Sequence, residues 1–409
     1  MSLKFKMFDN KLNPLIAISF LVSLLQTVFY PIHYLTYICS AFLCIVMIPH
    51  YHRLNKQTLI FRFILIYFCF LLIRGVLSGN FINYIIFDLN IYTAVIFIAF
   101  FVNVELTKNT YTQFPVLFAK LLLISIPFFF FIFLHFGNLS LGDEFARSLF
   151  DEDNSSIDRM AFIIPLSMAP LLVPFINDMK PSLKYVVIFA SILYLLTGIL
   201  TATRSVILIN LISYLPLLSF KRLLKNKILI IIISSSIFVL IVLFSGTEIF
   251  SLLGNRLDYT FLRFSKESDY SSGRDTEVKG LFKEFNSFDL VFGRGTGAEQ
   301  KFGFWKDIKT NMNEHGVNYT HFGFLYFILK GGFILLFIVY GLAFYSLFVL
   351  FRNGERKYFT VILLYLVAET SFTQFINYFY VLFLWVSISL ALRLSINSKS
   401  NNKIILRNL

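Results

Sequence analysis

The sequence predicts an all-α polytopic membrane protein with about 12 transmembrane helices and one large extracytoplasmic loop that contains short amphipathic helices. Three observations lead to this fold class. Of the 409 residues, 57% are hydrophobic and only 14% are charged, whereas charged residues make up about 25% of an average soluble domain. Apolar windows long enough to cross a hydrocarbon core recur along most of the chain. An excess of basic over acidic residues is confined to alternate gaps between these windows.

Each expected span is an apolar run of about 20 residues, the length that crosses a bilayer as a helix. The first run is followed by Tyr30-Pro31 and a second run rather than by a small-residue cleavage site, so we expect a signal anchor. The expected spans cover residues 14–30, 32–49, 58–77, 82–103, 115–136, 159–177, 182–200, 204–219, 228–245, 322–350, 357–372 and 373–393.

The gaps between the spans divide the chain into four parts. Residues 1–245 are expected to form a transmembrane bundle of about nine spans, with a small outward loop at 137–158. Residues 246–320 form the large loop, which is too long for an ordinary connection. Residues 321–393 hold the C-terminal spans, and residues 394–409 form a basic cytoplasmic tail.

Positive charge sets the expected orientation. A net charge of +13 could indicate nucleic-acid binding, but a basic excess that is confined to alternate loops marks the cytoplasmic side of a membrane protein. We therefore expect no nucleic-acid partner, both termini in the cytoplasm and the large loop outside, where no ATP or NAD is available. The basic residues that mark the expected cytoplasmic segments are Lys4, Lys6, Lys11, Arg53, Lys56, Lys108, Lys180, Lys184, Lys221, Arg222, Lys225, Lys227, Arg352, Arg356, Lys357, Lys399, Lys403 and Arg407.

The large loop is expected to contain short amphipathic helices, because Leu, Phe and Val recur at helical spacing in residues 248–264 and 276–285. We expect no metal site and no cofactor. Cys39, Cys44 and Cys69 all fall within spans, without the spacing of a zinc site or a disulfide framework. The outward carboxylates do not form a cluster typical of metal ligands.

Five ionisable residues are expected at one depth, near the outer surface. Arg74, Asp88 and Glu369 lie near the outer ends of their spans, Arg204 opens the eighth span, and His321 stands where the large loop re-enters the membrane. A charged residue at a helix centre costs about 2.5 to 3.5 kcal/mol on insertion scales. One such residue alone is well explained by snorkelling to water. Five at one level favour a polar cavity open to the outside, with Arg74, Asp88 and Glu369 as substrate-binding residues.

Arg204, in the stretch "TGILTATRSVILIN", is the strongest candidate. Its guanidinium group presents a planar fork of donors that fits phosphate and does not lose its proton. It is therefore suited to hold a lipid diphosphate. Thr201, Thr203 and Ser205 either assist it or cap the helix. His321 is compatible with a general base, a donor to phosphate or an interfacial histidine.

Two loop arginines come with glycine. Arg274 lies in "SSGRDTE", and Arg294 lies in "VFGRGTGAE" between Gly293 and Gly295, with Gly297 next. Such glycines allow backbone amides to converge on an anion or approach a sugar closely. A tight turn is the simpler interpretation of the glycines alone.

The order and spacing of these motifs around one outward loop resemble the O-antigen polymerase and O-antigen ligase superfamily. The resemblance covers residues 197–340, and the topology agrees across the rest. Phe322 stands where the family often has Asn after the histidine. The positions that carry the resemblance are Thr203, Arg204, Ser205, Gly273, Arg274, Gly293, Gly295, Gly297, His321, Gly331 and Gly332.

The resemblance implies a metal-independent GT-C-type glycosyltransferase of the bacterial inner membrane, with a periplasmic large loop. A polymerase would join undecaprenyl-diphosphate-linked repeat units, and a ligase would transfer the glycan to lipid A core. Expected partners are the lipid-linked oligosaccharide donor and acceptor, membrane lipid and a chain-length regulator protein.

The roles implied are catalytic for Arg204 and His321. Substrate binding is expected of Arg274, Arg294, Gly293 and Gly295. We favour the polymerase, because the composition is that of an AT-rich gene and the Asn after His321 is missing. A flippase or exporter of lipid-linked glycan is the alternative of a different class.

Overall fold

The computed structural model describes residues 59–86, 88–89, 108–136, 166–200, 204–217, 274–300, 323–371 and 378–407. Within these ranges every secondary-structure element is a helix, as the sequence predicts. Several predictions fall outside them: the spans at 14–30, 32–49 and 228–245, most of the span at 82–103, the outward loop at 137–158, the helix at 248–264, and His321.

The chain divides into two compact units. The first combines residues 1–112 with residues 271–409, and the second comprises residues 113–270. The division cuts across the expected order of spans, because the residues around the glycines at 293–297 belong to the same unit as residues 59–77 and 323–407. Each unit is described by itself.

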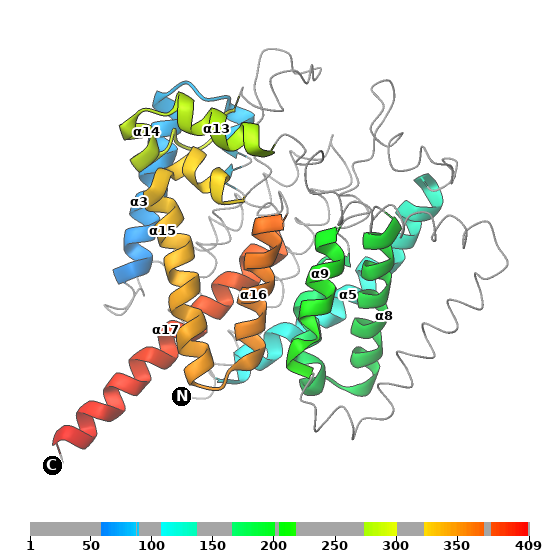
Figure 1. Cartoon of the computed structure of the whole chain (residues 1–409). Helices are drawn as coiled ribbons and strands as arrows, with labels where there is room; N and C mark the ends of the chain where they lie inside the picture. The colour runs from blue at the N-terminus through cyan, green and yellow to red at the C-terminus, as the bar shows by residue number, and fades with distance from the viewer. Residues whose placement is uncertain are drawn as a thin grey trace, which may run out of the picture. The chain divides into compact units, whose positions relative to one another are not determined.

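The first unit is built on three long helices that pack on one another: α15 (Gly323–Arg352), α16 (Arg356–Ser371) and α17 (Tyr378–Arg407). Helix α3 (Leu59–Leu77) lies against α15, which also carries the two short helices of the large loop (Figure 1). These are α13 (Arg274–Glu284), which confirms the helix predicted near 276–285, and α14 (Ser287–Phe292).

Helix α15 is two helices joined by a sharp bend. Gly332 has φ 61° and ψ −165°, a backbone conformation that is outside the helical region and essentially restricted to glycine. Figure 1 shows the short part before the bend turned away from the long part after it. The long part begins after Gly332 and ends at Arg352, so at 1.5 Å per residue it is about 30 Å long, the thickness of a hydrocarbon core.

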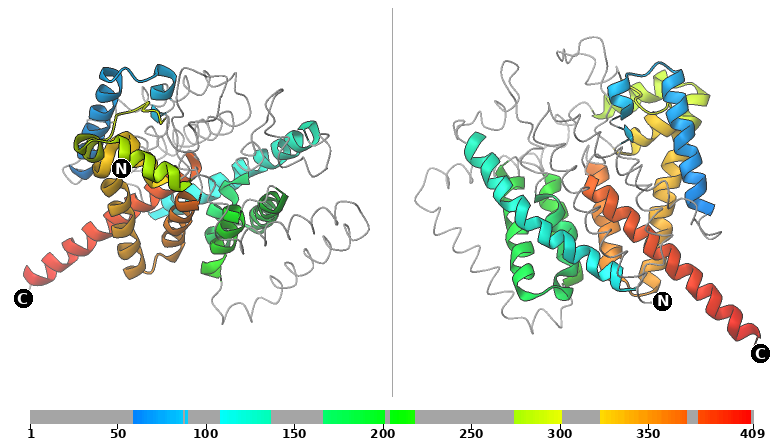
Figure 2. Two further views of the ribbon diagram at one scale, coloured as in Figure 1. Left: turned by 45° about the horizontal axis from the view of Figure 1, so that its top comes forward. Right: turned by 180° about the vertical axis from the view of Figure 1, so that it is seen from behind.

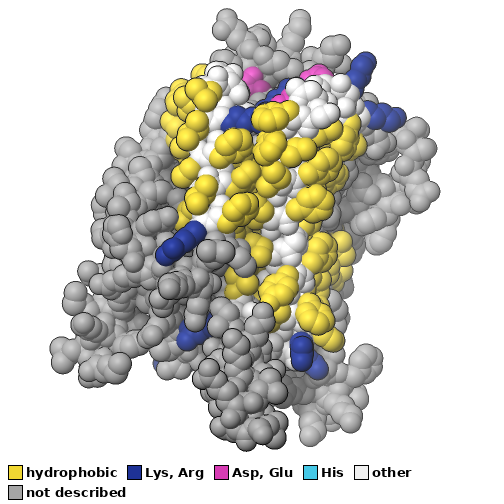
Figure 3. All heavy atoms as spheres, turned by 90° about the vertical axis from the view of Figure 1, so that its left-hand side faces the viewer, with side chains coloured by type: hydrophobic (Ala, Val, Ile, Leu, Met, Phe, Trp, Pro, Cys, Tyr) yellow, Lys and Arg dark blue, Asp and Glu magenta, His cyan; other side chains and the backbone are white. Residues whose placement is uncertain are grey.

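Two described helices are long and apolar enough to cross a membrane, Pro181–Gly198 and Gly323–Arg352. In the first unit, large hydrophobic side chains of α3 and α15 remain exposed, among them Ile66, Leu77 and Phe337. Figure 3 shows a broad hydrophobic face of the molecule with acidic and basic groups at its upper end. Exposed apolar patches of this extent mark a membrane or protein contact rather than a surface in water.

The second unit contains α8 (Pro181–Leu200) and α9 (Arg204–Ser213), which form a tightly packed antiparallel pair (Figure 2). Helix α5 (Lys108–Phe136) enters this unit. The remaining elements are α7 (Met168–Leu172) and the 3₁₀ turns Val173–Asp178 and Leu215–Leu217.

Two predicted spans differ from the structure in this unit. The described part of the span at 159–177 is a short helix followed by a 3₁₀ turn with Pro174 at its start. The span at 204–219 ends as an α-helix at Ser213, and Pro216 lies in the 3₁₀ turn that follows. Both interruptions have one cause, because proline lacks the N–H that continues an α-helix and its ring clashes with the preceding turn.

Candidate functional site

The centre of the candidate site is the glycine segment, residues 293–298, which follows α14. Asn286 caps α14 by accepting a hydrogen bond from the Asp289 amide at 2.7 Å. Gly293 ends the helix with φ 71°, and Gly295 and Gly297 also have positive φ. The segment is therefore a succession of tight turns that only glycine adopts without strain.

The glycine segment hydrogen-bonds to the bend of α15. The amides of Arg294 and Gly295 donate to the carbonyls of Leu329 and Lys330, each at 2.9 Å, and the Tyr67 hydroxyl of α3 donates to the Gly331 carbonyl at 2.6 Å. A bend leaves helix carbonyls without their usual donors. The broken helix and the glycine segment thus satisfy each other's backbone groups.

Close packing explains the glycines of this region. A side chain at Gly293 would collide with the backbone of Lys330 and Gly331, and one at Gly295 would collide with Gly75 of α3. The Gly293 and Gly295 amides already donate to carbonyls within the protein. These contacts agree with the tight-turn interpretation, and substrate binding by the two glycines stays a prediction.

A buried ion pair fixes the far end of the segment. Lys330 Nζ lies 2.9 Å from Asp88 Oδ2, and neither side chain is exposed. Lys330 also donates to the Ala298 carbonyl at 2.7 Å. Asp88 accepts hydrogen bonds from the Gly297 amide at 2.6 Å and the Tyr326 hydroxyl at 2.7 Å. Each charge therefore has the opposite charge and further hydrogen bonds, the conditions under which a buried ion pair is tolerated.

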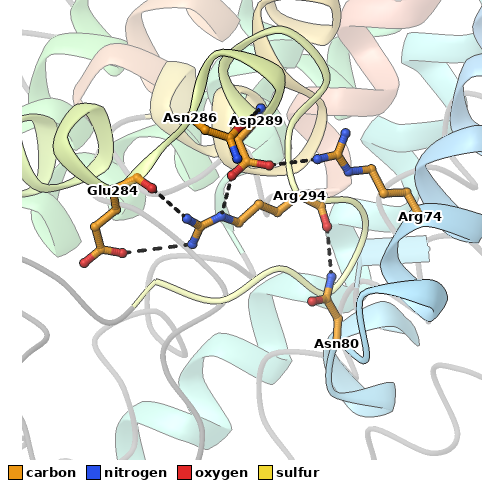
Figure 4. Close-up of polar contacts among 6 residues, drawn as sticks. All are labelled: Arg74, Asn80, Glu284, Asn286, Asp289 and Arg294. Carbon is orange, nitrogen blue, oxygen red and sulfur yellow. Dashed lines mark hydrogen bonds and ion pairs between the residues drawn. The ribbon is translucent and has the colours of Figure 1, made fainter.

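Arg74 and Arg294 converge on one carboxylate (Figure 4). Arg74 Nη2 donates to Asp289 Oδ1 at 2.8 Å, and Arg294 Nε donates to Asp289 Oδ2 at 3.3 Å. The two guanidinium groups lie over Phe288 and Phe285, with Cζ 4.5 Å and 4.4 Å from the ring centroids. The structure thus brings together two arginines that the sequence places 220 residues apart (294 − 74).

Asn80 and Glu284 complete the surroundings of this arginine pair. Asn80 Nδ2 donates to the carbonyls of Arg294 and Thr296 at 3.1 Å and 2.8 Å. Glu284 offers its carbonyl to Arg294 Nη2 at 3.1 Å, while its carboxylate is 4.0 Å from Nη1. Arg74 Nη1 is buried and has no hydrogen-bond partner within the described ranges.

Glu369 is a further predicted residue that the structure describes in full. It lies near the end of α16, is 1% exposed, and packs against Gly323 at the start of α15. The Tyr365 hydroxyl, one turn earlier on α16, is a hydrogen-bonding neighbour of its carboxylate. Tyr326, which bonds Asp88, is one turn of α15 beyond Gly323. The short part of α15 therefore contacts both Glu369, through Gly323, and Asp88, through Tyr326.

Arg204 belongs to the second unit and is the first residue of α9. Gly198 near the end of α8 packs directly against Val206 of α9. Deeper in the pair, Ser191 donates to Asn210 Oδ1 at 2.5 Å and Asn210 Nδ2 returns a bond to the Ser191 carbonyl at 3.0 Å. These contacts hold α9 against α8. Arg274 is the first residue of α13, and the side chains of Arg204 and Arg274 lie outside the described part of the structure.

Several residues of the site were not predicted. Asp289, Asn80 and Tyr67 gave no signal of their own, because each acts on a segment more than 200 residues away. Asn286 had a recognisable signal, an Asn directly before a short apolar run. Within the described ranges no three His, Cys, Asp or Glu side chains gather in a way that could hold a metal ion.

Comparisons with protein-family models and with curated proteins gave no match for this chain.

Proposed function

We propose that the protein is an O-antigen polymerase-type glycosyltransferase of the bacterial inner membrane. In this proposal it has about 12 transmembrane helices, both termini in the cytoplasm and a periplasmic large loop. It joins undecaprenyl-diphosphate-linked repeat units: the glycan on one lipid is transferred to the non-reducing end of another. No metal or cofactor takes part.

The observation that carries the proposal is how the loop is fastened to the helices. The glycine segment lies on the bend of α15 and against α3, and the buried Asp88–Lys330 pair holds it there. Arg294 of the segment is thereby set beside Arg74 of α3. A periplasmic loop that binds lipid-linked glycan has to be held in a fixed position beside the membrane helices.

The surroundings of the arginine pair also favour a lipid-linked substrate. Phe288 and Val291 of α14 are 58% and 41% exposed, and Ile73 of α3 is 59% exposed. Figure 3 shows a hydrophobic face of the molecule with charged groups at its upper end. A polyprenyl diphosphate has the matching division, an apolar chain below and an anionic group above.

Charge stabilisation is the chemistry we assign to arginine. Transfer from a diphosphate develops negative charge on the leaving group, and fixed donors that neutralise it supply a large part of catalysis. Arg204 holds the diphosphate in this proposal, and Arg274, Arg294 and Arg74 bind substrate, as the sequence predicts. His321 contacts the phosphate or the acceptor hydroxyl.

The test is glycan joining by the purified protein in lipid vesicles supplied with undecaprenyl-diphosphate repeat units from its own host. Wild type, Arg204→Ala and Arg352→Ala are compared. Arg352 is an exposed arginine at the end of α15 that lies away from the bend, and its replacement removes the same charge as Arg204→Ala. We expect a ladder from wild type and Arg352→Ala, and a loss of about 100-fold or more in Arg204→Ala, as for removal of one stabilising donor.

The alternatives give different products. Glycan that forms only on added lipid A core would make the protein a ligase. Absence of any new glycosidic bond in wild type, combined with movement of lipid-linked glycan across the vesicle membrane, would replace the proposal with transport.

A further inference from the structure

The two short helices of the large loop, α13 and α14, expose large hydrophobic side chains. Phe288 and Val291 lie one turn apart on the same face of α14, and Phe282 lies near the end of α13. Each of the three is more than 40% exposed. Both helices are too short to cross a hydrocarbon core. Membrane spanning therefore does not explain why these side chains lie outside the core of the protein.

Two rows of aromatic rings connect these side chains to the long helices of the first unit. One row runs from α3 to α14, and the other runs from the long part of α15 to α13. The rows are Phe70–Phe292–Phe288, with neighbouring ring centroids 6.0 and 4.8 Å apart, and Phe337–Phe333–Phe282, with centroids 6.3 and 6.4 Å apart. The apolar surface of the long helices thus continues onto both loop helices, so the exposed side chains are not isolated ones.

The bend of α15 marks the level at which the long helices meet the loop helices. Phe337 is 71% exposed within a helix long and apolar enough to cross a membrane. It lies five residues beyond Gly332, a rise of about 7 Å. The end of α14 lies at the bend itself, because a side chain at Gly332 would collide with the backbone of Val291 and Phe292. If Phe337 contacts acyl chains, α14 lies at the edge of the same hydrocarbon layer.

The charges beside these side chains are compatible with a lipid surface. Asp289, next to Phe288, is paired with Arg74 and Arg294, so acyl chains can approach α14 without burying an unpaired carboxylate. On α13, Lys279 and Lys283 are exposed one turn apart. Lysine side chains at an apolar boundary extend their ammonium groups toward water and lipid phosphate while their methylene groups stay in the apolar layer.

We propose that α13 and α14 lie in the membrane interface, on the side of the membrane that carries the large loop. Phe282, Phe288 and Val291 lie among the outer parts of the acyl chains, as in interfacial amphipathic helices. Lys279 and Lys283 contact the phosphates of phospholipid head groups. The large loop is thereby bound to the lipid surface as well as to the bend of α15. This inference goes beyond the proposed function and does not rest on it, because contact with phospholipid requires no glycan.

Spin labels on single cysteines measure the depth of each helix in the bilayer. The full chain, with its three cysteines replaced by alanine, is placed in nanodiscs of phosphatidylethanolamine and phosphatidylglycerol. Phe288→Cys tests α14, Phe337→Cys is the reference in the span, and Asn353→Cys, in the exposed turn after α15, is the reference in water. Collision of each label with oxygen, which dissolves in acyl chains, is compared with collision with a water-soluble nickel complex.

We expect the label at residue 288 to collide mainly with oxygen and to lie about 15 Å from the bilayer centre, half the thickness of the hydrocarbon core. The label at residue 337 should lie about 7 Å deeper, and the label at residue 353 should collide mainly with the nickel complex. If Phe288→Cys does not fold, Val291→Cys replaces it, because it lies on the same face of α14.

The contact between lysine and phosphate has its own test. Lys283→Glu should move a label at Phe282→Cys toward water, because a carboxylate is repelled by lipid phosphate. Lys180→Glu changes the charge of an exposed lysine in the second unit by the same amount and should leave the label where it is. An unchanged depth in Lys283→Glu would overturn the lysine contact.

Two results would overturn the position of α14. A label at residue 288 that meets the nickel complex as often as the label at residue 353 places the helix in water. A label that neither reagent reaches is covered by protein, either a second copy of this chain or another part of it. Neither measurement involves glycan joining, so failure of this inference and failure of the proposed function are observed separately.

Discussion

Lys330 Nζ and Asp88 Oδ2 are 2.9 Å apart and fully buried, and the two side chains hydrogen-bond to neighbouring backbone groups of the glycine segment. Asp88 binds the Gly297 amide, while Lys330 binds the Ala298 carbonyl. The pair therefore joins two segments, 88–89 and the bend of α15, to the glycine segment between them. A loop predicted to lie in water is fastened to the helices by charges that water does not reach.

Breaking this pair should destabilise the fold strongly. Lys330→Met leaves the Asp88 charge buried without compensation, a change that costs about 3 to 5 kcal/mol in comparable pairs. The double variant Asp88→Asn, Lys330→Met should recover part of the loss. Unfolding in detergent measures both, with Lys180→Met, at an exposed lysine, as the control. A single variant as stable as the control would contradict the role of the pair.

The bend of α15 predicts opposite effects for two glycines of one helix. Gly332→Ala must place a side chain at φ 61° against the backbone of Val291 and Phe292, so we expect destabilisation of about 1 to 3 kcal/mol or more. Gly341 has nothing within 4 Å of a built Cβ, and Gly341→Ala should stabilise the helix by about 0.5 to 1 kcal/mol.

Gly354→Ala separates conformation from collision. Gly354 has φ 74° with open space around a Cβ, so its substitution tests the backbone cost alone. The three variants are compared by thermal unfolding. Equal stability of Gly332→Ala and Gly341→Ala would mean that α15 does not bend at residue 332.

The coupling energy between Arg74 and Asp289 should be larger than that between Arg294 and Glu284. Arg74 and Asp289 have 14% and 13% exposed side chains and are 2.8 Å apart, so a double-mutant cycle should give a coupling of about 1 to 3 kcal/mol. Arg294 and Glu284 are 4.0 Å apart and 32% and 44% exposed, and exposed pairs contribute about 0 to 1 kcal/mol. Equal couplings in the two cycles would contradict this arrangement of charges.

The α8–α9 pair offers a prediction in the second unit. Asn210→Leu removes the two hydrogen bonds to Ser191 and leaves the Ser191 hydroxyl with Tyr214, whose hydroxyl donates to it at 3.0 Å. Interhelical hydrogen bonds in membranes contribute about 0.6 kcal/mol on average and up to about 1.7 kcal/mol. We expect a loss in that range, measured against Leu211→Ala at an exposed position. In the glycan-joining assay of the proposed function, a loss of activity in Asn210→Leu that exceeds the loss of stability would indicate that the α8–α9 pair positions Arg204.

Local patterns predicted much of the helical structure. Apolar runs located α3, α8, α15 and α16 within a few residues, because a helix that is apolar over its length needs no partner to define its extent. The proline interruptions near residues 174 and 216 were present in the same runs but were outweighed by their hydrophobicity. The start of α9 at Arg204 was also predicted, from a polar turn before an apolar run.

The site was only partly predictable. Arg74, Asp88 and Glu369 were recognised one by one, because a charge within an apolar run is costly wherever it points. Their partners were not recognised: Asp289 for Arg74, Lys330 for Asp88, and Gly323 beside Glu369. A charge in a span reveals that it needs a partner, but the identity of the partner depends on which helices meet.

The sequence by itself thus determined that the chain is helical, which runs are apolar, and which residues cannot be buried alone. These properties follow from local composition and backbone chemistry. Only the tertiary structure decided that the glycines at 293, 295 and 297 fit against α3 and the bend of α15 rather than remaining free in a loop. The reason is physical: a missing Cβ permits close approach in any direction, and the direction is chosen by carbonyls that a bend at Gly332 sets free.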